Sequence, residues 1–370
     1  MKNRIRYVIT VFVALLFIIV GNKVAVKDLK ISEENYQETV AAKITKIIER
    51  NEQKYETDNI EMIDITFEAV VTSGERKGEF ITATQNLVSI SNGHVKEVEN
   101  GDKVVLTTFE YGAEWYFMEY VRTDKLIALG IVFALGLLVF GRKKGFNTII
   151  SLGFTCAAIF AVFIPAILSG KNIYFLSIII CMYTIVMTFL IVHGYNRKTL
   201  AATIGCFSGI AMTGIITIIM DKVLYLTGMI NEESFYLTTL PIENTINLRG
   251  IIFGAILVGA MGAIIDVSMS IASSLWEVHE QAKDIKFKEL MKSGMNIGQD
   301  MMGTMTSTLI LAYIGSSLSI VLLFSVYHDS LIGMLNMELI VVEILQTIVR
   351  QLRYTVYYTA HFCSVCIYLL

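Results

Sequence analysis

Eight apolar runs, separated by short polar segments, make up most of this chain. The first run, Tyr7–Val20, follows a basic N-terminus, and the other seven follow residue 124. Most runs approach the roughly 20 residues that an α-helix needs to cross a bilayer. The pattern predicts a membrane all-α helical bundle of about eight transmembrane helices. The seven later runs are Leu126–Phe140, Phe146–Leu168, Ile173–Val192, Leu200–Met220, Gly250–Trp276, Gly303–Tyr327 and Met337–Leu370.

Residues 23–124 show a different pattern. About half of the Lys, Arg, Asp and Glu residues lie here, and short segments are separated by Gly-bearing turns. From Ile63 to Ala69 every second residue is apolar, as in a strand with one wet face. We expect a small β-barrel-like domain, OB-like or SH3-like, built from Ile44–Glu49, Met62–Val71, Glu79–Leu87, Lys103–Glu110 and Trp115–Arg122.

The composition agrees with a membrane protein. Hydrophobic residues make up 54% of the chain and charged residues 17%, and the mean hydropathy is +0.61, which is too apolar for a water-soluble domain. A net charge of −3 offers no basic surface for nucleic acid. Small β-barrels often bind sugars or oligonucleotides. Because this segment is acidic, we expect it not to bind nucleic acid. A structural cap, a sugar-binding module and a module that binds another envelope component remain as alternatives.

The positions of basic residues predict the topology. The N-terminus, Arg142–Lys144 and Arg197–Lys198 are expected on the cytoplasmic side by the positive-inside rule. Residues 23–124 then form an extracytoplasmic domain between the first and second transmembrane helices. No small-x-small cleavage site follows the first run, so residues 1–22 are predicted to be an uncleaved membrane anchor rather than a signal peptide.

A carboxylate, Asp266, lies near the middle of the run Gly250–Trp276. An ionised carboxylate at that depth is costly unless it is paired, hydrated or protonated. Two stripes at helical spacing, one polar and one of small residues, are Gly262, Asp266, Ser270 and Ser274, and Ala255, Gly259 and Ala263. One interpretation is a proton relay, supported by Ser270. The other is a structural Asp that accepts hydrogen bonds from Ser and Thr of neighbouring helices.

The run after it, Gly303–Tyr327, begins with polar residues that are unusual for a lipid-facing helix. Thr304, Ser307 and Thr308 share one side, from which their hydroxyls can reach Asp266; ordinary contacts between helices are the alternative. Asp300 is expected near the helix start, where a capping role is favoured. Gly303, like Gly259 and Gly262, is expected at a close contact between helices.

Enzyme motifs are incomplete in this chain. His279–Lys283 has Lys where an HExxH zinc site requires its second His. Gly205–Gly209 lacks the spacing of a GxSxG nucleophile motif. Cys363 and Cys366 form a lone CxxC without a second pair of zinc ligands. We therefore expect no enzyme activity, no metal site and no cofactor.

Two blocks of sequence, Gly262–Ser274 and Gly303–Met305 followed by Thr308–Ser317, carry a family resemblance. With these blocks, and with Pro165, Gly170, Glu338 and Glu343, the chain from Asp124 to about Thr347 resembles the YibE/F family of bacterial multi-spanning membrane proteins. Gln299 and Ser307 stand where the family pattern has Arg and Asn. The family's biochemical role is not established, so the resemblance implies an architecture and a location in the bacterial cytoplasmic membrane.

A second, weaker resemblance concerns mechanism. A glycine-rich helix with a mid-membrane Asp, a charged loop and a Thr-rich helix is similar, over about 60 residues, to the export subunits SecD and SecF and to RND transporters. This resemblance implies proton-driven transport through Asp266. Because RND-like machines combine two halves, we expect a homodimer or a paired membrane-protein partner, in addition to membrane lipid.

The C-terminal end departs from the family pattern. Arg350, Arg353 and His361 place polar groups in the last run, where a Gly-Ser start and a Pro-containing apolar helix are expected. A one-base shift of suitable codons would restore such a helix. We therefore interpret 350–370 as a frameshifted end of the YibE/F-like bundle formed by residues 125–370, which resequencing of the gene tests.

The leading functional hypothesis is a proton-coupled membrane transporter or export factor for an unknown small or envelope substrate. Asp266 would carry the proton, and Thr304, Ser307 and Thr308 would tune it. The alternative is a non-catalytic scaffold or envelope assembly factor whose β domain binds an envelope component. Asp266→Asn separates the two, because a scaffold should tolerate it and a proton carrier should not.

Overall fold

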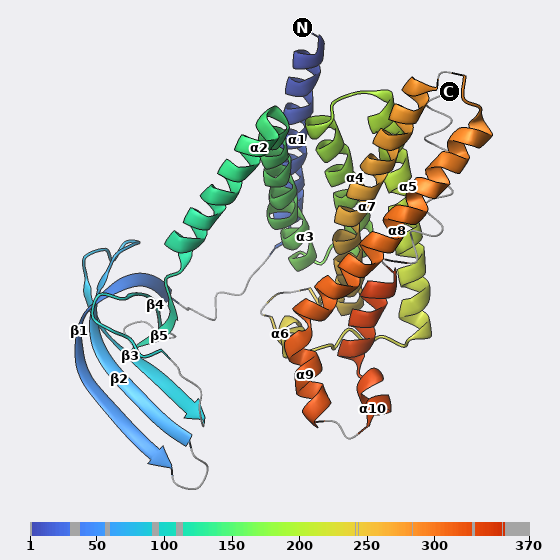
Figure 1. The fold of residues 1–370 in the computed structure, drawn as a ribbon. Helices are drawn as coiled ribbons and strands as arrows, with labels where there is room; N and C mark the ends of the chain where they lie inside the picture. Colours follow the sequence, from blue (N-terminus) through green and yellow to red (C-terminus); the bar gives the residue numbers. More distant parts are fainter. Residues whose placement is uncertain are drawn as a thin grey trace. The chain divides into compact units, whose positions relative to one another are not determined.

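The computed structural model divides the chain into two compact units (Figure 1). One unit, Ser32–Gly136, holds the β-strands, and the other combines Met1–Ile31 with Leu137–Leu370 and holds most of the helices. The structure describes residues 2–29, 38–55, 60–90, 96–108, 114–240, 242, 244–282, 284–327, 330–349 and 351.

Five strands of the first unit form a closed barrel: β1 Glu38–Tyr55, β2 Ile60–Val71, β3 Phe80–Ile90, β4 Lys103–Thr108 and β5 Trp115–Tyr120. Their order is β1-β2-β3-β5-β4, and β3 and β5 pair in parallel while the other neighbours are antiparallel. This order is that of OB-type barrels, one of the two expected types. The barrel closes where the first part of β1 pairs with β4.

The apolar residues of the predicted alternation lie in the barrel core. Ile63, Ile65 and Phe67 are buried, whereas Asp64 between them is exposed. The five predicted strands are confirmed, although β1 extends well beyond the expected Ile44–Glu49. Residues 38–43 pair with β4 and residues 42–55 with β2. Two register shifts, between Ile44 and Lys46 and between Ile47 and Glu49, lie in the part that pairs with β2. Such bulges bend a strand, so that one strand serves two neighbours around the barrel.

Gln85 is a polar side chain buried inside this barrel. Its amide nitrogen donates to the Lys96 carbonyl at 3.3 Å, and its amide oxygen accepts the Val98 N–H at 2.9 Å. The Tyr120 hydroxyl donates to the same Lys96 carbonyl at 2.9 Å. Because a buried amide is stable only when it is hydrogen-bonded, Gln85 fixes the segment before β4 to the barrel wall.

The second unit contains α1 Lys2–Val26, η1 Ile159–Phe163, α3 Ile164–Leu168, α4 Ile173–Val192, α5 Arg197–Val223, α6 Glu232–Thr238, α7 Leu248–Gln281, α8 Phe287–Ser316, α9 Leu318–Tyr327 and α10 Leu331–Leu335. The helix α2, Thr123–Ala158, begins in the first unit and ends in the second. Several of these helices are long and apolar, which indicates a multi-pass membrane protein. The described residues contain five candidate spans: Arg4–Val26, Thr123–Leu168, Ile173–Val192, Arg197–Val223 and Leu248–Gln281.

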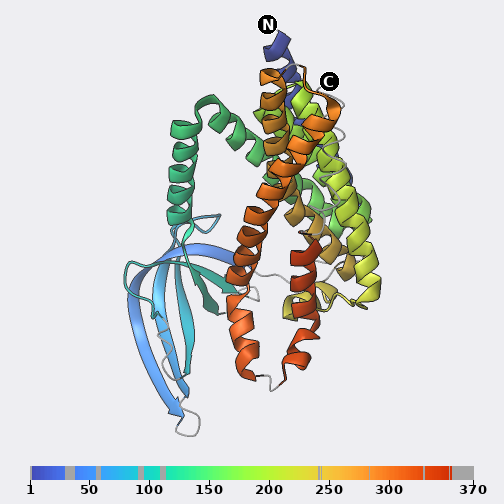
Figure 2. The ribbon, with the colours of Figure 1, turned by 45° about the vertical axis from the view of Figure 1, so that its right-hand side comes forward.

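One of these stretches, Thr123–Leu168, joins two predicted runs. It is 46 residues long, more than twice the roughly 20 residues that one crossing needs. The helix is broken at Arg142, where φ is 49°, and Figure 2 shows the sharp bend in α2. A Cβ atom on Gly145 would lie 1.9 Å from the Leu137 carbonyl oxygen, so only glycine fits this turn.

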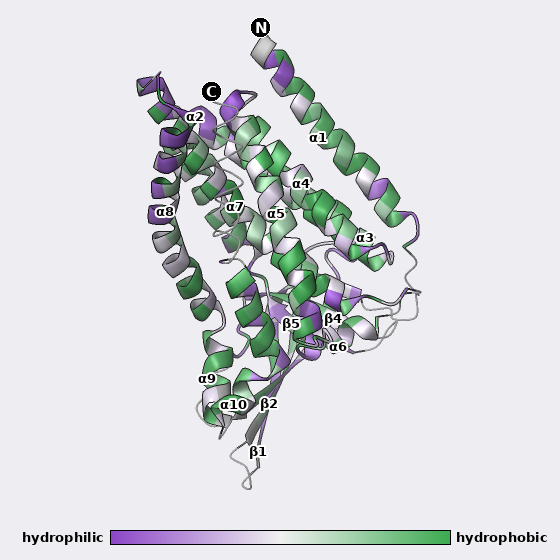
Figure 3. Cartoon of the chain, turned by 90° about the vertical axis from the view of Figure 1, so that its right-hand side faces the viewer, coloured by the Kyte–Doolittle hydropathy of each residue, from purple (hydrophilic) through white to green (hydrophobic). Residues whose placement is uncertain are grey.

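In the last two apolar runs the observed helices differ from the predicted ones. Gly303–Tyr327 is divided between α8 and α9, which break at Ser317. Figure 3 shows that α8 is hydrophilic where it begins and that α9 is hydrophobic. Of Met337–Leu370 the structure describes a helix over 338–349 and Gln351, so Arg350, Arg353, His361, Cys363 and Cys366 lie outside the described residues. The total of eight transmembrane helices, and the frameshift at 350–370, stay predictions.

Helices α4, α5 and α7 build the core of the second unit. Phe189 of α4, Ala202 of α5 and Ile264 of α7 belong to one buried cluster. Each of the three helices begins after an Asn whose side-chain oxygen accepts a backbone N–H of the first turn: Asn172, Asn196 and Asn247. Asn is among the best N-cap residues because it satisfies an N–H that has no partner within the helix.

The helix α1 is fixed to the bundle at a proline. Pro165 has no N–H to give to the Ala161 carbonyl, and the π-helical turn η1 lies just before it. The side chain of Asn22 on α1 donates to that carbonyl at 2.5 Å, and the Ser169 hydroxyl donates to the Ala25 carbonyl of α1. At Gly21 an added Cβ would lie 2.9 Å from the Val162 side chain. The proline therefore supplies the attachment point of α1.

Replacing Asn22 tests this attachment. Asn22→Leu removes the hydrogen bond that the Ala161 carbonyl accepts from α1, so we expect a loss of about 0.5–1.5 kcal/mol in the free energy of unfolding. Denaturant titration of the purified protein in detergent measures the loss. Thr10→Val is the matched control, because among the described residues the Thr10 hydroxyl bonds only the Arg6 carbonyl of its own helix. Equal stability of the two variants would contradict the role of Asn22.

Candidate functional site

Asp266 lies near the middle of α7, on one exposed face of the helix. Gly262 and Ser270 share this face, whereas Ile264, Val267 and their neighbours on the other side are buried in the core with α4 and α5. The predicted polar stripe is thus present as a continuous surface of the described bundle. Ser274 is half-buried at the end of this stripe.

The small-residue stripe belongs to the same exposed face. Ala255 and Gly259 are exposed, and a Cβ atom added to Gly262 would meet no described atom within 4 Å. The same holds for Gly303 on α8. Among the described residues, no helix therefore packs tightly against Gly262 or Gly303. The close contacts expected for Gly259, Gly262 and Gly303 stay a prediction.

The hydroxyl groups of α8 bond their own helix. Thr304 donates to the Asp300 carbonyl at 3.1 Å, Ser307 to the Gly303 carbonyl at 3.3 Å, and Thr308 to the Thr304 carbonyl at 3.0 Å. All three side chains are exposed. Within the described part of the chain, no hydrogen bond or ion pair joins them to Asp266. The structure thus places the hydroxyls on the surface of α8 without bringing them to the carboxylate.

The capping role expected for Asp300 is wrong. α8 begins at Phe287, so Asp300 lies well inside the helix, where backbone N–H groups are already bonded. The start of α8 is closed by Glu289, whose carboxylate accepts the Lys286 N–H at 3.3 Å. The first turns of α8 are polar, so the apolar run begins later than the helix does. Hydropathy alone therefore does not reveal where the helix starts.

The buried polar group of α7 is Ser268, which the sequence analysis did not single out. Its hydroxyl donates to the Ile264 carbonyl at 2.5 Å and lies 3.0 Å from the Cys206 sulfur of α5. Both side chains are fully buried. A hydroxyl is a small group that can bond its own helix, so it is tolerated in the contact between α5 and α7.

The buried positions of α8 are not among the predicted site residues. The buried residues of α8 are Leu290, Gly294 and Gly298, and α8 packs against α7. Their spacing of four residues is the GxxxG signal for close helix packing, which was visible in the sequence. The predicted Gly303 is the next glycine along the helix and is exposed.

Glu338 joins the helix over 338–349 to the loop after α5. Its carboxylate accepts the N–H groups of Thr227 and Gly228 and the Thr227 hydroxyl, each at 2.7 Å. Gly228 has φ of 91°, a conformation that favours glycine. Three donors on one carboxylate make a charge-assisted clamp between two distant parts of the chain. The sequence showed Glu338 only as part of a family-like pattern.

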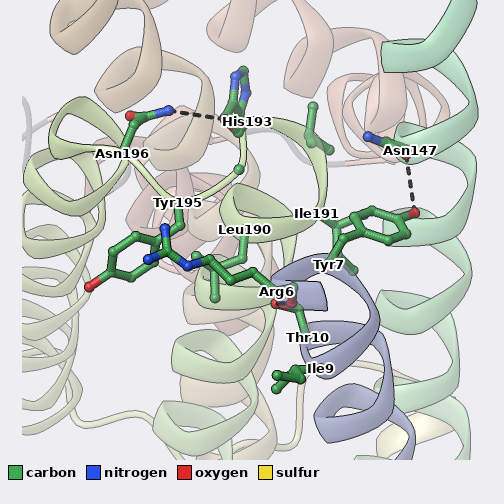
Figure 4. Close-up of a pocket in the computed structure, with 12 residues that line it drawn as sticks. Arg6, Tyr7, Ile9, Thr10, Asn147, Leu190, Ile191, His193, Tyr195 and Asn196 are labelled. Carbon is green, nitrogen blue, oxygen red and sulfur yellow. Dashed lines mark hydrogen bonds between the residues drawn. The ribbon is translucent and has the colours of Figure 1, made fainter. Parts of the chain in front are cut away.

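A pocket of about 770 Å³ lies where α1 begins and α4 ends (Figure 4). Arg6 and Tyr7 of α1, Asn147 of α2 and His193 and Tyr195 of the loop after α4 line it. This site has no signature in the sequence, because its walls come from three separate segments. Within the described ranges, no three His, Cys, Asp or Glu side chains gather as ligands of a metal ion would.

Replacing Glu338 tests the clamp. Glu338→Ala leaves the two N–H groups without their acceptor, so we expect the free energy of unfolding to fall by about 1.5–3 kcal/mol. Thermal unfolding in detergent micelles provides the measurement. Glu343→Ala, on the same helix, is the control, because its carboxylate has no described hydrogen bond. A Glu338 variant as stable as the Glu343 variant would rule out the clamp.

The comparisons with known proteins identify the family. A family model described as YibE/F-like protein matches residues 129–364. The match spans more than half of the chain, includes Asp266, Asn147 and Glu338, and runs past Arg350. Searches of curated proteins and of solved structures find no match. The chain belongs to the YibE/F-like protein family.

Proposed function

We propose that this protein is a proton-coupled membrane transporter or export factor in which Asp266 carries the proton. The observation that carries the proposal is a single carboxylate at the middle of α7, a long apolar helix of the bundle. An ionised carboxylate is costly at membrane depth, while a protonated one is much less so. Such a group gains and loses its proton when access to water changes, which is what coupling requires.

The surroundings of Asp266 support this role. Within the described residues, Asp266 has no ion pair or hydrogen bond that would hold it permanently charged. The neighbouring positions on its face, Gly262 and Ser270, are small. Small side chains leave space for water or for the helix of a partner, so the environment of the carboxylate can change between two states.

The partner and the topology belong to the same proposal. An exposed face that carries Asp266 is suited to a second copy of this chain or to a paired membrane protein, which would complete the site. The proposed location is the bacterial cytoplasmic membrane, with the N-terminus cytoplasmic and residues 23–124 extracytoplasmic. The substrate is a small or envelope compound, and no enzymatic step is part of the proposal.

Two measurements test Asp266 as a proton carrier. In proteoliposomes with an imposed pH gradient and cell-envelope extract as the substrate source, we expect Asp266→Asn to reduce proton uptake to less than about a tenth of the wild-type rate, because Asn cannot ionise. A hydrophobic carbodiimide should label Asp266 in wild-type protein, and labelling should decrease as pH rises, because the reagent attacks the protonated carboxyl group.

Asp284→Asn is the matched control, because Asp284 is an exposed carboxylate between α7 and α8. Proton uptake by this variant should equal that of wild type. If Asp266 is not labelled, or if Asp266→Asn transports protons as well as wild type, the proton-carrier role fails. The alternative function, a scaffold or envelope assembly factor whose barrel binds an envelope component, would then be favoured.

A further inference from the structure

The pocket at the beginning of α1 has walls that are held in place by the protein itself. The Tyr7 hydroxyl donates to the Asn147 side-chain oxygen at 3.1 Å, which joins α1 to α2 (Figure 4). The Asn196 amide donates to the His193 carbonyl at 3.0 Å and shapes the loop after α4. These bonds need no ligand, so the pocket of about 770 Å³ is preformed and has the size of a small-molecule site.

The charge of this pocket is positive. Arg6 lines it with its guanidinium 5.1 Å from the centre of the Tyr195 ring, and no Asp or Glu is among the lining residues. Within the described part of the chain, Arg6 forms no ion pair. Burial, and to a lesser extent the charges of Lys144 and Lys198, lower the pKa of His193 on the pocket wall. An anion is therefore the ligand that the pocket favours.

The pocket is also amphipathic. Its polar lining includes Arg6 and Asn147, whereas Ile9, Leu190 and Ile191 give it an apolar side. It lies at the ends of two candidate membrane spans, Arg4–Val26 and Ile173–Val192. At such a level the hydrocarbon of a bilayer gives way to phosphate headgroups. Basic pockets between transmembrane helices at this level fit anionic headgroups.

We propose that this pocket binds the phosphate group of an anionic phospholipid. Arg6 contacts the phosphate, since its planar guanidinium presents several donors to phosphate oxygens. The Asn147 and Tyr195 side chains border the headgroup, and the acyl chains lie along Ile9 and Leu190. A lipid bound here would touch α1, α2 and the loop after α4 together, and so would stabilise the contact of the first helix with the bundle.

Lipid titration of the purified full-length chain, followed by native mass spectrometry, tests the proposal. We expect wild type to bind phosphatidylglycerol about tenfold more tightly than phosphatidylcholine, and Arg6→Gln to lose this preference. Arg6→Lys should keep part of it, because the charge is retained. Arg4→Gln is the matched control: it removes one positive charge from the same helix end, but Arg4 does not line the pocket.

The arms of the experiment distinguish a lipid from a free anion. Inorganic phosphate, added at millimolar concentration, should leave the binding of phosphatidylglycerol unchanged. Displacement of the lipid by inorganic phosphate would overturn the lipid proposal and indicate that the pocket binds free phosphate. Equal losses in Arg6→Gln and Arg4→Gln, or equal binding of both lipids to wild type, would overturn the proposal.

Discussion

Every backbone N–H and carbonyl group inside a membrane needs a partner within the protein, and this constraint underlies the helical part of the chain. α4, α5 and α7 meet it as helices closed at their start by an Asn side chain. Pro165 has no N–H to donate to the Ala161 carbonyl, and the Asn22 side chain of α1 donates to this carbonyl instead. In the other unit, which the proposed topology places outside the membrane, the β-strands pair their backbone groups with one another in a barrel.

The same constraint decides which polar side chains of α7 are buried and which are exposed. A serine hydroxyl can donate to a carbonyl of its own helix, so Ser268 is buried with its hydrogen bond satisfied. A carboxylate needs donors, and in the middle of a helix the backbone N–H groups are already used. Asp266 accordingly lies on the exposed face, where water, a proton or a partner can satisfy it. Because Asp266 is exposed, its surroundings can change as water or a partner approaches it.

Local patterns predicted much of the fold because they are local in origin. The alternation from Ile63 to Ala69 sets which side of β2 is buried, and the apolar runs correspond to long helices. The patterns failed where the outcome depends on distant residues. β1 is long because it pairs with two strands, and the first turns of α8 are held by Leu290, which is buried in the same cluster as residues of α7. Neither effect has a signature in hydropathy.

The sequence by itself determined the membrane character of the chain, the presence of five β-strands before Asp124 and the presence of Asp266 within an apolar helix. These follow from composition and from periods of two and of about 3.6 residues, which each segment carries alone. The family followed from the resemblance of particular blocks of sequence, such as Gly262–Ser274. Only the tertiary structure decided which face of α7 is free, that Glu338 holds the loop at Thr227, and that Arg6 and Asn147 line one pocket. The last two features join segments more than a hundred residues apart, and all three depend on the packing of whole helices, which no local pattern encodes.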